Sequence, residues 1–131
     1  MGTEWCHDAM HKPARAAIWT VTIPLATIFV LVGLSKLAGP SALRWGERFA
    51  HWGYPVASQY VIGTLEILSG VGLLIPKLRR SAAGTLIAMM IGAMCTHLVN
   101  AEYPRLIPPL VLAALALVLM FDRPRTKSRA V

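Results

Sequence analysis

Apolar residues dominate four stretches of the chain, and short polar segments separate these stretches. The stretches are residues 16–38, 56–75, 82–99 and 106–121. Each approaches the roughly 20 mostly apolar residues that a helix needs to cross a bilayer. Gly39-Pro40 and Pro76 stand where the first two stretches end, as is typical of helix termini. The pattern predicts an all-α fold, an integral membrane four-helix bundle.

A further, short helix is predicted between the first and second spans. Residues 41–54 read SALRWGERFAHWGY, in which Trp45, Phe49 and Trp52 are interleaved with charged side chains. Aromatic rings mixed with charges in a short segment are typical of a helix that lies in the membrane interface. A polar connecting loop that contains aromatic residues is the alternative interpretation.

The composition favours lipid over water as the surroundings of these helices. The chain has 131 residues, 56% of them hydrophobic, and a mean hydropathy of +0.57. A soluble domain of this length could not bury so many apolar side chains in one core. The net charge of +7 lies in short basic blocks that flank the apolar stretches, as in membrane proteins. We therefore expect the lipid bilayer as a partner, and no nucleic acid.

The basic blocks also predict the orientation. Nine Lys and Arg residues lie in residues 1–15, 77–80 and 122–131, whereas the opposite side carries only Arg44, Arg48 and Arg105. Because basic flanks stay in the cytoplasm, we expect both termini to be cytoplasmic, in the cell (inner) membrane. The chain then divides into a cytoplasmic N-terminal segment (1–15), a membrane domain (16–121) and a basic cytoplasmic tail (122–131). A cleavable signal peptide is disfavoured, because the first apolar stretch is too long.

Three ionisable residues fall within the predicted spans, namely Lys36, Glu66 and His97. A charge at this depth costs about 2.5–3.5 kcal/mol on insertion scales, so it needs a partner or a function. Side chains tilt toward the N-terminus of their helix, which brings all three to a shared depth of about 5–10 Å below the outer surface. We predict a Lys36–Glu66 ion pair with His97 near it. Such a cluster either fixes helix register or forms a pocket that binds a head group or relays protons. The alternative for Lys36 alone is that its side chain snorkels to the interface.

The second span presents one face of small and polar residues. Gln59, Gly63, Glu66 and Gly70 recur at heptad spacing, so they share that face. Glycine there allows a neighbouring helix to approach closely. The face is therefore expected to point into the bundle and not toward lipid.

Methionines on the third span suggest how a pocket beside the cluster is lined. Met90 and Met94 precede His97 on about the same side of the helix. Thioethers line adaptable pockets and also fill cores, so a pocket for a flat hydrophobe such as a quinone and ordinary core packing are both open. The candidate lining residues are Gln59, Gly63, Gly70, Met90 and Met94.

Motifs for catalysis are absent from the sequence. There is no P-loop, no GxGxxG opening a helix after a strand, no HExxH and no GxSxG. Cys6 and Cys95 form no CxxC pair. Cys6, His7 and His11 are metal-binding residue types, but on a terminal segment they are usually incidental, so no metal site is predicted. We expect that the chain is not an enzyme on its own.

Five segments together carry a resemblance to a known family. They are GLSKL (33–37), GYP (53–55), IGTLEILSGVGLLIP (62–76), RRSAA (79–83) and TH (96–97). With the G-x-x-E-x-x-x-G pattern after a Lys at a helix end, they resemble the DoxX-like family of small four-helix membrane proteins. The similarity covers about residues 29–121.

The resemblance implies an accessory membrane subunit of a redox system. The family takes its name from a membrane subunit of an archaeal thiosulfate:quinone oxidoreductase, and other members are linked to oxidative-stress complexes. It implies membrane or redox protein partners and places Lys36, Glu66 and His97 at recurring polar positions. Distant relatives are membrane chaperones, so a non-enzymatic scaffold or assembly factor is one alternative. A small proton-coupled carrier that uses Glu66 is another, and a bound quinone and a homo-oligomer stay open.

Overall fold

The chain folds into helices throughout the part that the structure describes. This computed structural model describes the backbone of residues 4–122 and the side chains of residues 14–122. The elements in chain order are α1 (Glu4–Leu37), α2 (Pro40–His51), α3 (Ser58–Leu74), α4 (Arg79–Val99), the short 3-10 helix η1 (Tyr103–Leu106) and α5 (Ile107–Phe121). Within those described residues there is no β-strand, as the periodicity predicts.

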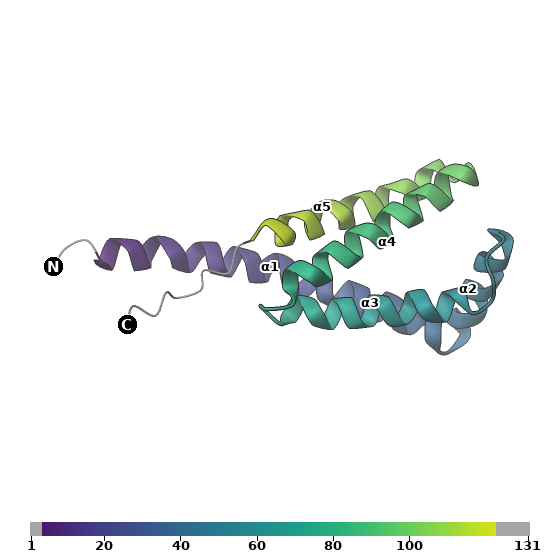
Figure 1. The fold of residues 1–131 in the computed structure, drawn as a ribbon, viewed down its shortest axis with the longest axis horizontal. Helices are drawn as coiled ribbons and strands as arrows, with labels where there is room; N and C mark the ends of the chain where they lie inside the picture. Colours follow the sequence, from purple (N-terminus) through teal and green to yellow (C-terminus); the bar gives the residue numbers. More distant parts are fainter. Residues whose placement is uncertain (1–3, 123–131) are drawn as a thin grey trace.

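The long helices form two antiparallel pairs. In Figure 1, α1 lies along α3 and α4 lies along α5, and the two pairs diverge toward the end where α2 lies. The core joins the pairs at the other end, where Leu25 and Phe29 of α1 meet Leu73 of α3, Leu86 of α4 and Leu119 of α5. These five side chains are at most 1% exposed. Close van der Waals packing of these branched and aromatic side chains therefore joins the pairs at one end.

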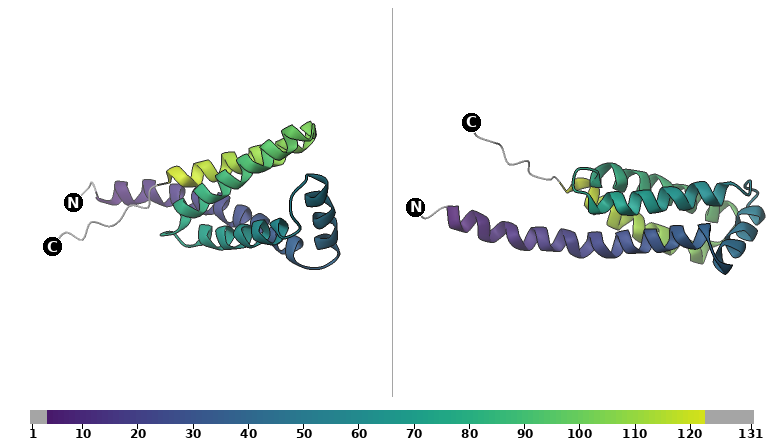
Figure 2. Two further views of the ribbon diagram at one scale, coloured as in Figure 1. Left: turned by 45° about the vertical axis from the view of Figure 1, so that its right-hand side comes forward. Right: turned by 90° about the horizontal axis from the view of Figure 1, so that it is seen from below.

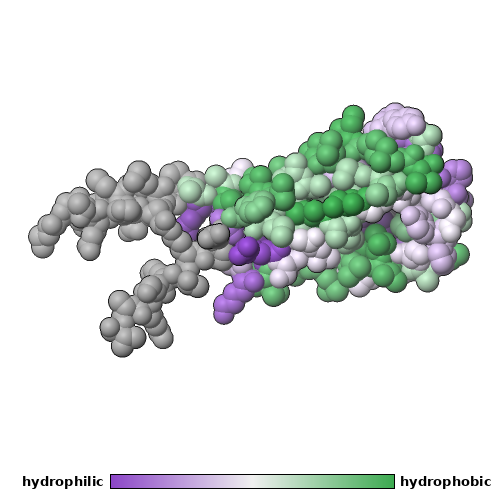
Figure 3. Space-filling view, turned by 45° about the horizontal axis from the view of Figure 1, so that its top comes forward, coloured by the Kyte–Doolittle hydropathy of each residue, from purple (hydrophilic) through white to green (hydrophobic). Residues whose placement is uncertain are grey.

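Three of the helices are long and apolar enough to cross a membrane, namely Ala14–Leu37 within α1, Arg79–Val99 and Tyr103–Phe121. Helix α3 is also apolar but has only 17 residues. Large apolar side chains such as Leu68, Ile91 and Val118 are more than half exposed. Figure 3 shows a broad apolar surface between polar ends, which is the distribution that a helix bundle in lipid requires.

Several predicted boundaries differ from the observed ones. Helix α1 begins at Glu4, whereas the first apolar stretch begins at residue 16, because polar residues continue the helix beyond the apolar part. Helix α4 begins at Arg79 and not at residue 82. The predicted interfacial segment is a helix at Pro40–His51, which runs crosswise to α3 at one end of the molecule (Figure 2).

Side chains from neighbouring elements bond to the carbonyl groups that three helices leave free at their C-terminal ends. Gln59 Nε2 donates to Lys36 O at the end of α1, at 3.2 Å. Arg79 Nε donates to Leu73 O of α3 and Arg80 Nε to Met120 O of α5, both at 3.1 Å. The last four carbonyls of a helix have no partner within it, and cations are favoured at this negative end of the helix dipole.

Candidate functional site

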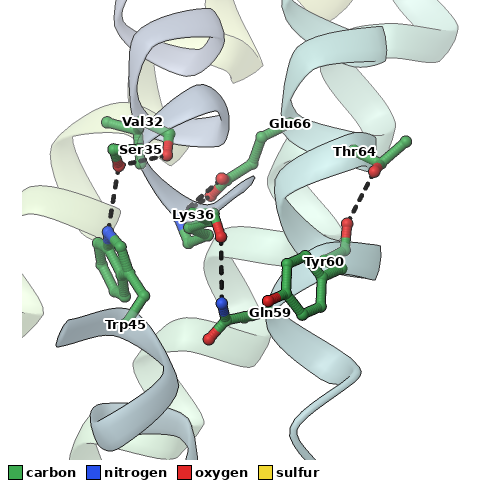
Figure 4. Close-up of polar contacts among 8 residues, drawn as sticks. All are labelled: Val32, Ser35, Lys36, Trp45, Gln59, Tyr60, Thr64 and Glu66. Atoms are coloured by element: carbon green, nitrogen blue, oxygen red, sulfur yellow. Dashed lines mark hydrogen bonds and ion pairs between the residues drawn. The ribbon is translucent and has the colours of Figure 1, made fainter. Parts of the chain in front are cut away.

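A buried ion pair joins α1 to α3. Lys36 Nζ lies 2.7 Å from Glu66 Oε2 and 2.9 Å from Glu66 Oε1. Each residue is only 4% exposed. Both carboxylate oxygens accept from the same ammonium group, so neither charge is left unpaired in the apolar surroundings. Figure 4 shows the two side chains pointing toward one another from adjacent helices.

Glycine makes this contact possible by letting the two backbones approach. A Cβ atom built on Gly33 would lie 2.6 Å from Gly63 O, and one on Gly63 would lie 3.0 Å from Lys36 Cβ. One on Gly70 would lie 3.0 Å from Ala26 O. Real Cβ atoms do not tolerate the shortest of these distances, so glycine sets the spacing of α1 and α3 along the same face that carries Glu66.

The ring of Trp45 in α2 covers the ion pair. Lys36 Nζ lies 4.2 Å from the centre of this ring, within the range of a cation–π interaction. Trp45 Nε1 donates to Ser35 Oγ at 3.1 Å, and Ser35 Oγ donates to Val32 O at 2.7 Å. The indole is thus fixed over the ammonium group by a chain of hydrogen bonds that begins on α1.

Gln59 fixes the corner between α1 and α2 next to the pair. Its Nε2 donates to Lys36 O and to Ala42 O, both at 3.2 Å. Its Oε1 is buried and lies 3.0 Å from where a Cβ of Gly46 would be. Within residues 14–122 this oxygen has no hydrogen-bond partner. Gln59 of α3 therefore links the backbone at the end of α1 to the backbone of α2.

His97 lies in a second polar group. Its Nδ1 is 2.7 Å from Glu102 Oε2, and the ring of Trp52 meets the imidazole edge-on with centroids 5.4 Å apart. Arg105 Nη1 donates to Glu102 Oε1 at 2.9 Å. The hydrogen bond from His97, with a further contribution from Arg105, lowers the pKa of Glu102 below its ordinary value.

The structure therefore brings together two of the three predicted cluster residues and gives His97 a different partner. Two features explain the difference. Helix α4 diverges from the α1–α3 pair at this end (Figure 1). The chain also folds back after α4 through Ala101, whose φ is +56°, so that Glu102 N donates to His97 O at 2.8 Å. That turn places the Glu102 carboxylate at the imidazole.

The predicted pocket-lining residues occupy packed positions. Gln59, Gly63 and Gly70 are buried against α1, and Met90 is 7% exposed in the core, while Met94 is half-buried. Two shallow hollows lie elsewhere, one of about 230 Å³ and one of about 180 Å³. The larger is lined by Ile23, Ala26, Thr27, Val30, Leu31 and Leu74, and the smaller by Ser41, Arg44, Trp45 and Arg48. Neither is lined by Lys36 or Glu66.

Metal ligands do not gather in the part of the chain whose side chains are described. No group of three His, Cys, Asp or Glu residues there could hold an ion. The side chains of Cys6, His7 and His11 lie outside the described residues, as does the tail after Asp122. Cys95 is exposed on α4 as a free thiol.

Arg79 has a structural role, although its place in a basic turn predicts a membrane-flanking charge. It is 7% exposed, and its Nη1 lies 3.4 Å from Asp122 Oδ2 while its Cζ lies 4.7 Å from the centre of the Trp19 ring. Together with the bond to Leu73 O it joins α4 to α1, α3 and the end of α5. The sequence holds no signal that separates Arg79 from Lys77 and Arg80, which lie in the same basic turn and are exposed.

Comparison with known proteins places this fold in a family. No curated protein and no solved structure matches the chain. The sequence profile of the DoxX-like family matches residues 20–119, a range that contains the ion pair, Trp45 and the His97–Glu102 pair. The chain therefore belongs to the DoxX-like family and is a membrane protein.

Proposed function

We propose that this protein is a non-catalytic accessory subunit of a membrane redox system. The proposal rests on the burial and mutual pairing of Lys36 and Glu66. Each charge neutralises the other at 2.7 Å, and Trp45 covers the ammonium group. A general acid or base must be within reach of its substrate, which a pair 4% exposed is not. The resemblance to the family supplies the link to redox chemistry.

Part of this proposal is a topology of four spans with both termini in the cytoplasm. The three long helices satisfy the length requirement directly. Helix α3 has 17 residues, about 26 Å at 1.5 Å per residue, against a hydrocarbon core of about 30 Å. A helix this much shorter than the core can still cross with modest thinning of the bilayer. The basic flanks favour the cytoplasm for the α3–α4 turn.

A bound quinone would need a hollow next to the polar groups that recognise its head group. Neither hollow touches the ion pair, and the larger is lined only by aliphatic side chains and Thr27. The residues present around Lys36 and Glu66 therefore do not fit a quinone site in this conformation. In the proposed role the chain supports a redox complex and does not itself transfer electrons.

The test is co-purification from native membranes in mild detergent after chemical crosslinking. We expect a partner subunit that carries a flavin, haem or iron–sulfur group, visible by its absorbance, in a fixed ratio to this chain. Deletion of the gene should lower the amount of that partner in the membrane. Recovery of the chain with only itself, under crosslinking that captures known complexes in the same membranes, would contradict the proposal.

A proton-coupled carrier is the second candidate, because Glu66 is an ionisable group within an apolar helix. Liposomes containing the purified protein distinguish the two. A carrier predicts proton flux that Glu66→Gln abolishes and that Glu47→Gln, a change at an exposed acid of α2, leaves intact. An accessory subunit predicts no flux above protein-free liposomes with either protein.

A further inference from the structure

The smaller hollow lies at the surface of α2. It has a volume of about 180 Å³ and is lined by Ser41, Arg44, Trp45 and Arg48. These residues occupy the first turns of α2 on one side of the helix, because three- and four-residue spacings repeat. Ser41 and the two arginines are exposed, and Trp45 is half-buried.

The two arginines of this hollow have no acidic partner in the described residues. Ion pairs there join Lys36 to Glu66, Arg79 to Asp122, and both His97 and Arg105 to Glu102. Like charges four residues apart on a helix repel each other. An anion between Arg44 and Arg48 would remove this repulsion and receive hydrogen bonds from two guanidinium groups.

Trp45 gives the hollow a fixed wall. Arg48 Cζ lies 5.3 Å from the centre of the Trp45 ring, and the ring is itself held by its bond to Ser35 and by the Lys36 ammonium group. An aromatic face within this distance attracts and orients a guanidinium group. The hollow is thus organised before any ligand binds.

The N-terminus of α2 adds further donors. Helix α2 begins with Pro40, and no side chain caps its first amide groups. Pro40 has no N–H and Ala42 N donates to Gly39 O at 3.1 Å, so it is mainly the helix dipole that favours an anion at this end. The hydroxyl group of Ser41 lies in this first turn and is an additional donor.

The surroundings of the hollow favour an anionic lipid over a free anion. Its lining residues belong to α2, which crosses the end of α1 at one end of the molecule (Figure 2). Leu43 on α2 is 74% exposed, and Leu34 and Leu31 on the neighbouring part of α1 are 48% and 60% exposed. Phosphate next to acyl chains is the combination of groups that a polar hollow beside exposed apolar side chains favours.

We propose that Ser41, Arg44, Trp45 and Arg48 form a binding site for the phosphate group of an anionic phospholipid such as phosphatidylglycerol. The phosphate lies between the two guanidinium groups, and the acyl chains lie along the exposed apolar face of α1. The site depends on the membrane location of the chain and not on the identity of any redox partner.

Native mass spectrometry of the full chain released from detergent micelles tests the site. Dioleoylphosphatidylglycerol should bind more tightly than dioleoylphosphatidylcholine. Arg44→Gln/Arg48→Gln should weaken phosphatidylglycerol binding by about 30-fold, because each basic side chain near an anionic surface contributes about 1 kcal/mol and 1.4 kcal/mol corresponds to tenfold. The matched control is Arg15→Gln/Lys77→Gln, which removes the same charge outside α2 and should retain the tight site.

Arg44→Lys/Arg48→Lys keeps both positive charges but lacks the planar guanidinium fork, so it should bind phosphatidylglycerol more tightly than the Gln double variant and less tightly than the unchanged protein. Equal phosphatidylglycerol binding by the Gln double variant and the unchanged protein would overturn the proposal. Equal affinity for phosphatidylcholine would overturn the assignment to an anionic lipid. Displacement of the lipid by millimolar inorganic phosphate would show a site for free phosphate instead.

Discussion

At the scale of single residues, each strongly buried cation is balanced by a group on another helix. Lys36 has Glu66 and the face of Trp45, and Arg79 has Leu73 O and Asp122. Desolvation of an ion costs several kcal/mol, which only close partners offset. The buried charges therefore show which elements must stay in register, namely α1 with α3, and α4 with α3 and the end of α5.

The pairing of Lys36 with Glu66 predicts a non-additive response to mutation. Lys36→Met or Glu66→Gln alone leaves one charge buried without its partner and should lower stability by about 3–5 kcal/mol. The double variant removes both charges and should cost clearly less than the sum, about 1–2 kcal/mol, since the remaining loss is mainly packing. Thermal and denaturant unfolding in detergent measures the stability of the unchanged protein, the two single variants and the double variant.

The control is a second double-mutant cycle at two exposed charges that are far apart in the chain, with Glu47→Gln and Lys77→Met. Their effects should be small, within about 0.5 kcal/mol each, and additive. Additive losses in the Lys36–Glu66 cycle as well would show that the two residues do not stabilise the fold as a pair.

The direction of side chains along helices made the Lys36–Glu66 contact predictable from the sequence. The partner of His97 was not predictable in the same way, because it depends on the left-handed conformation of Ala101 and on the divergence of α4 from α3. The cover formed by Trp45 also escaped prediction. Aromatic content shows that α2 lies at an interface, but not which ring turns toward Lys36.

At the scale of secondary structure elements, contact between α1 and α3 depends on the absence of side chains. Gly33 and Gly63 face each other so closely that each would place a Cβ within 3.0 Å of the other's carbonyl oxygen. In lipid, apolar burial does not drive helices together, and close packing of small residues takes that role. The heptad pattern predicted the glycine face of α3 but not its counterpart at Gly33.

Gly33→Ala should therefore destabilise the protein. The added Cβ would lie 2.6 Å from Gly63 O, which is backbone and cannot rotate away, so α1 must shift at a cost of about 1–3 kcal/mol. Gly92→Ala in α4 is the matched control, because nothing lies within 4 Å of its added Cβ. It should be neutral or stabilising by up to about 1 kcal/mol, as alanine is the better helix former. Unfolding midpoints in detergent compare the two, and equal shifts would contradict the close approach of α1 and α3.

At the scale of the whole molecule, the two helix pairs share a core at one end and are bridged at the other. The bridge comes from the segment after α2, where Tyr54 OH and Thr96 Oγ1 are 2.7 Å apart and Trp52 meets His97. Polar contacts thus close the end at which the apolar core is absent. The sequence predicted four membrane-spanning helices; three of the helices are long enough to cross a membrane, and α3 is apolar but shorter. The divergence of the pairs depends on packing between residues far apart in the chain.

The proposed topology makes a specific prediction for sites at the two ends of α3. In a Cys6→Ser/Cys95→Ser background, Ala57→Cys precedes α3 and Lys77→Cys follows it, and both positions are exposed. Because charge asymmetry places the α3–α4 turn in the cytoplasm, a membrane-impermeant maleimide should label Ala57→Cys on intact spheroplasts. It should label Lys77→Cys only after permeabilisation. Tyr103→Cys, at the first residue of η1 after the C-terminal end of α4, should behave like Ala57→Cys, and the cysteine-free protein should not react. Labelling of positions 57 and 77 from the same side would mean that the 17 residues of α3 do not cross the bilayer, so that Glu66 would be held in a re-entrant or interfacial helix.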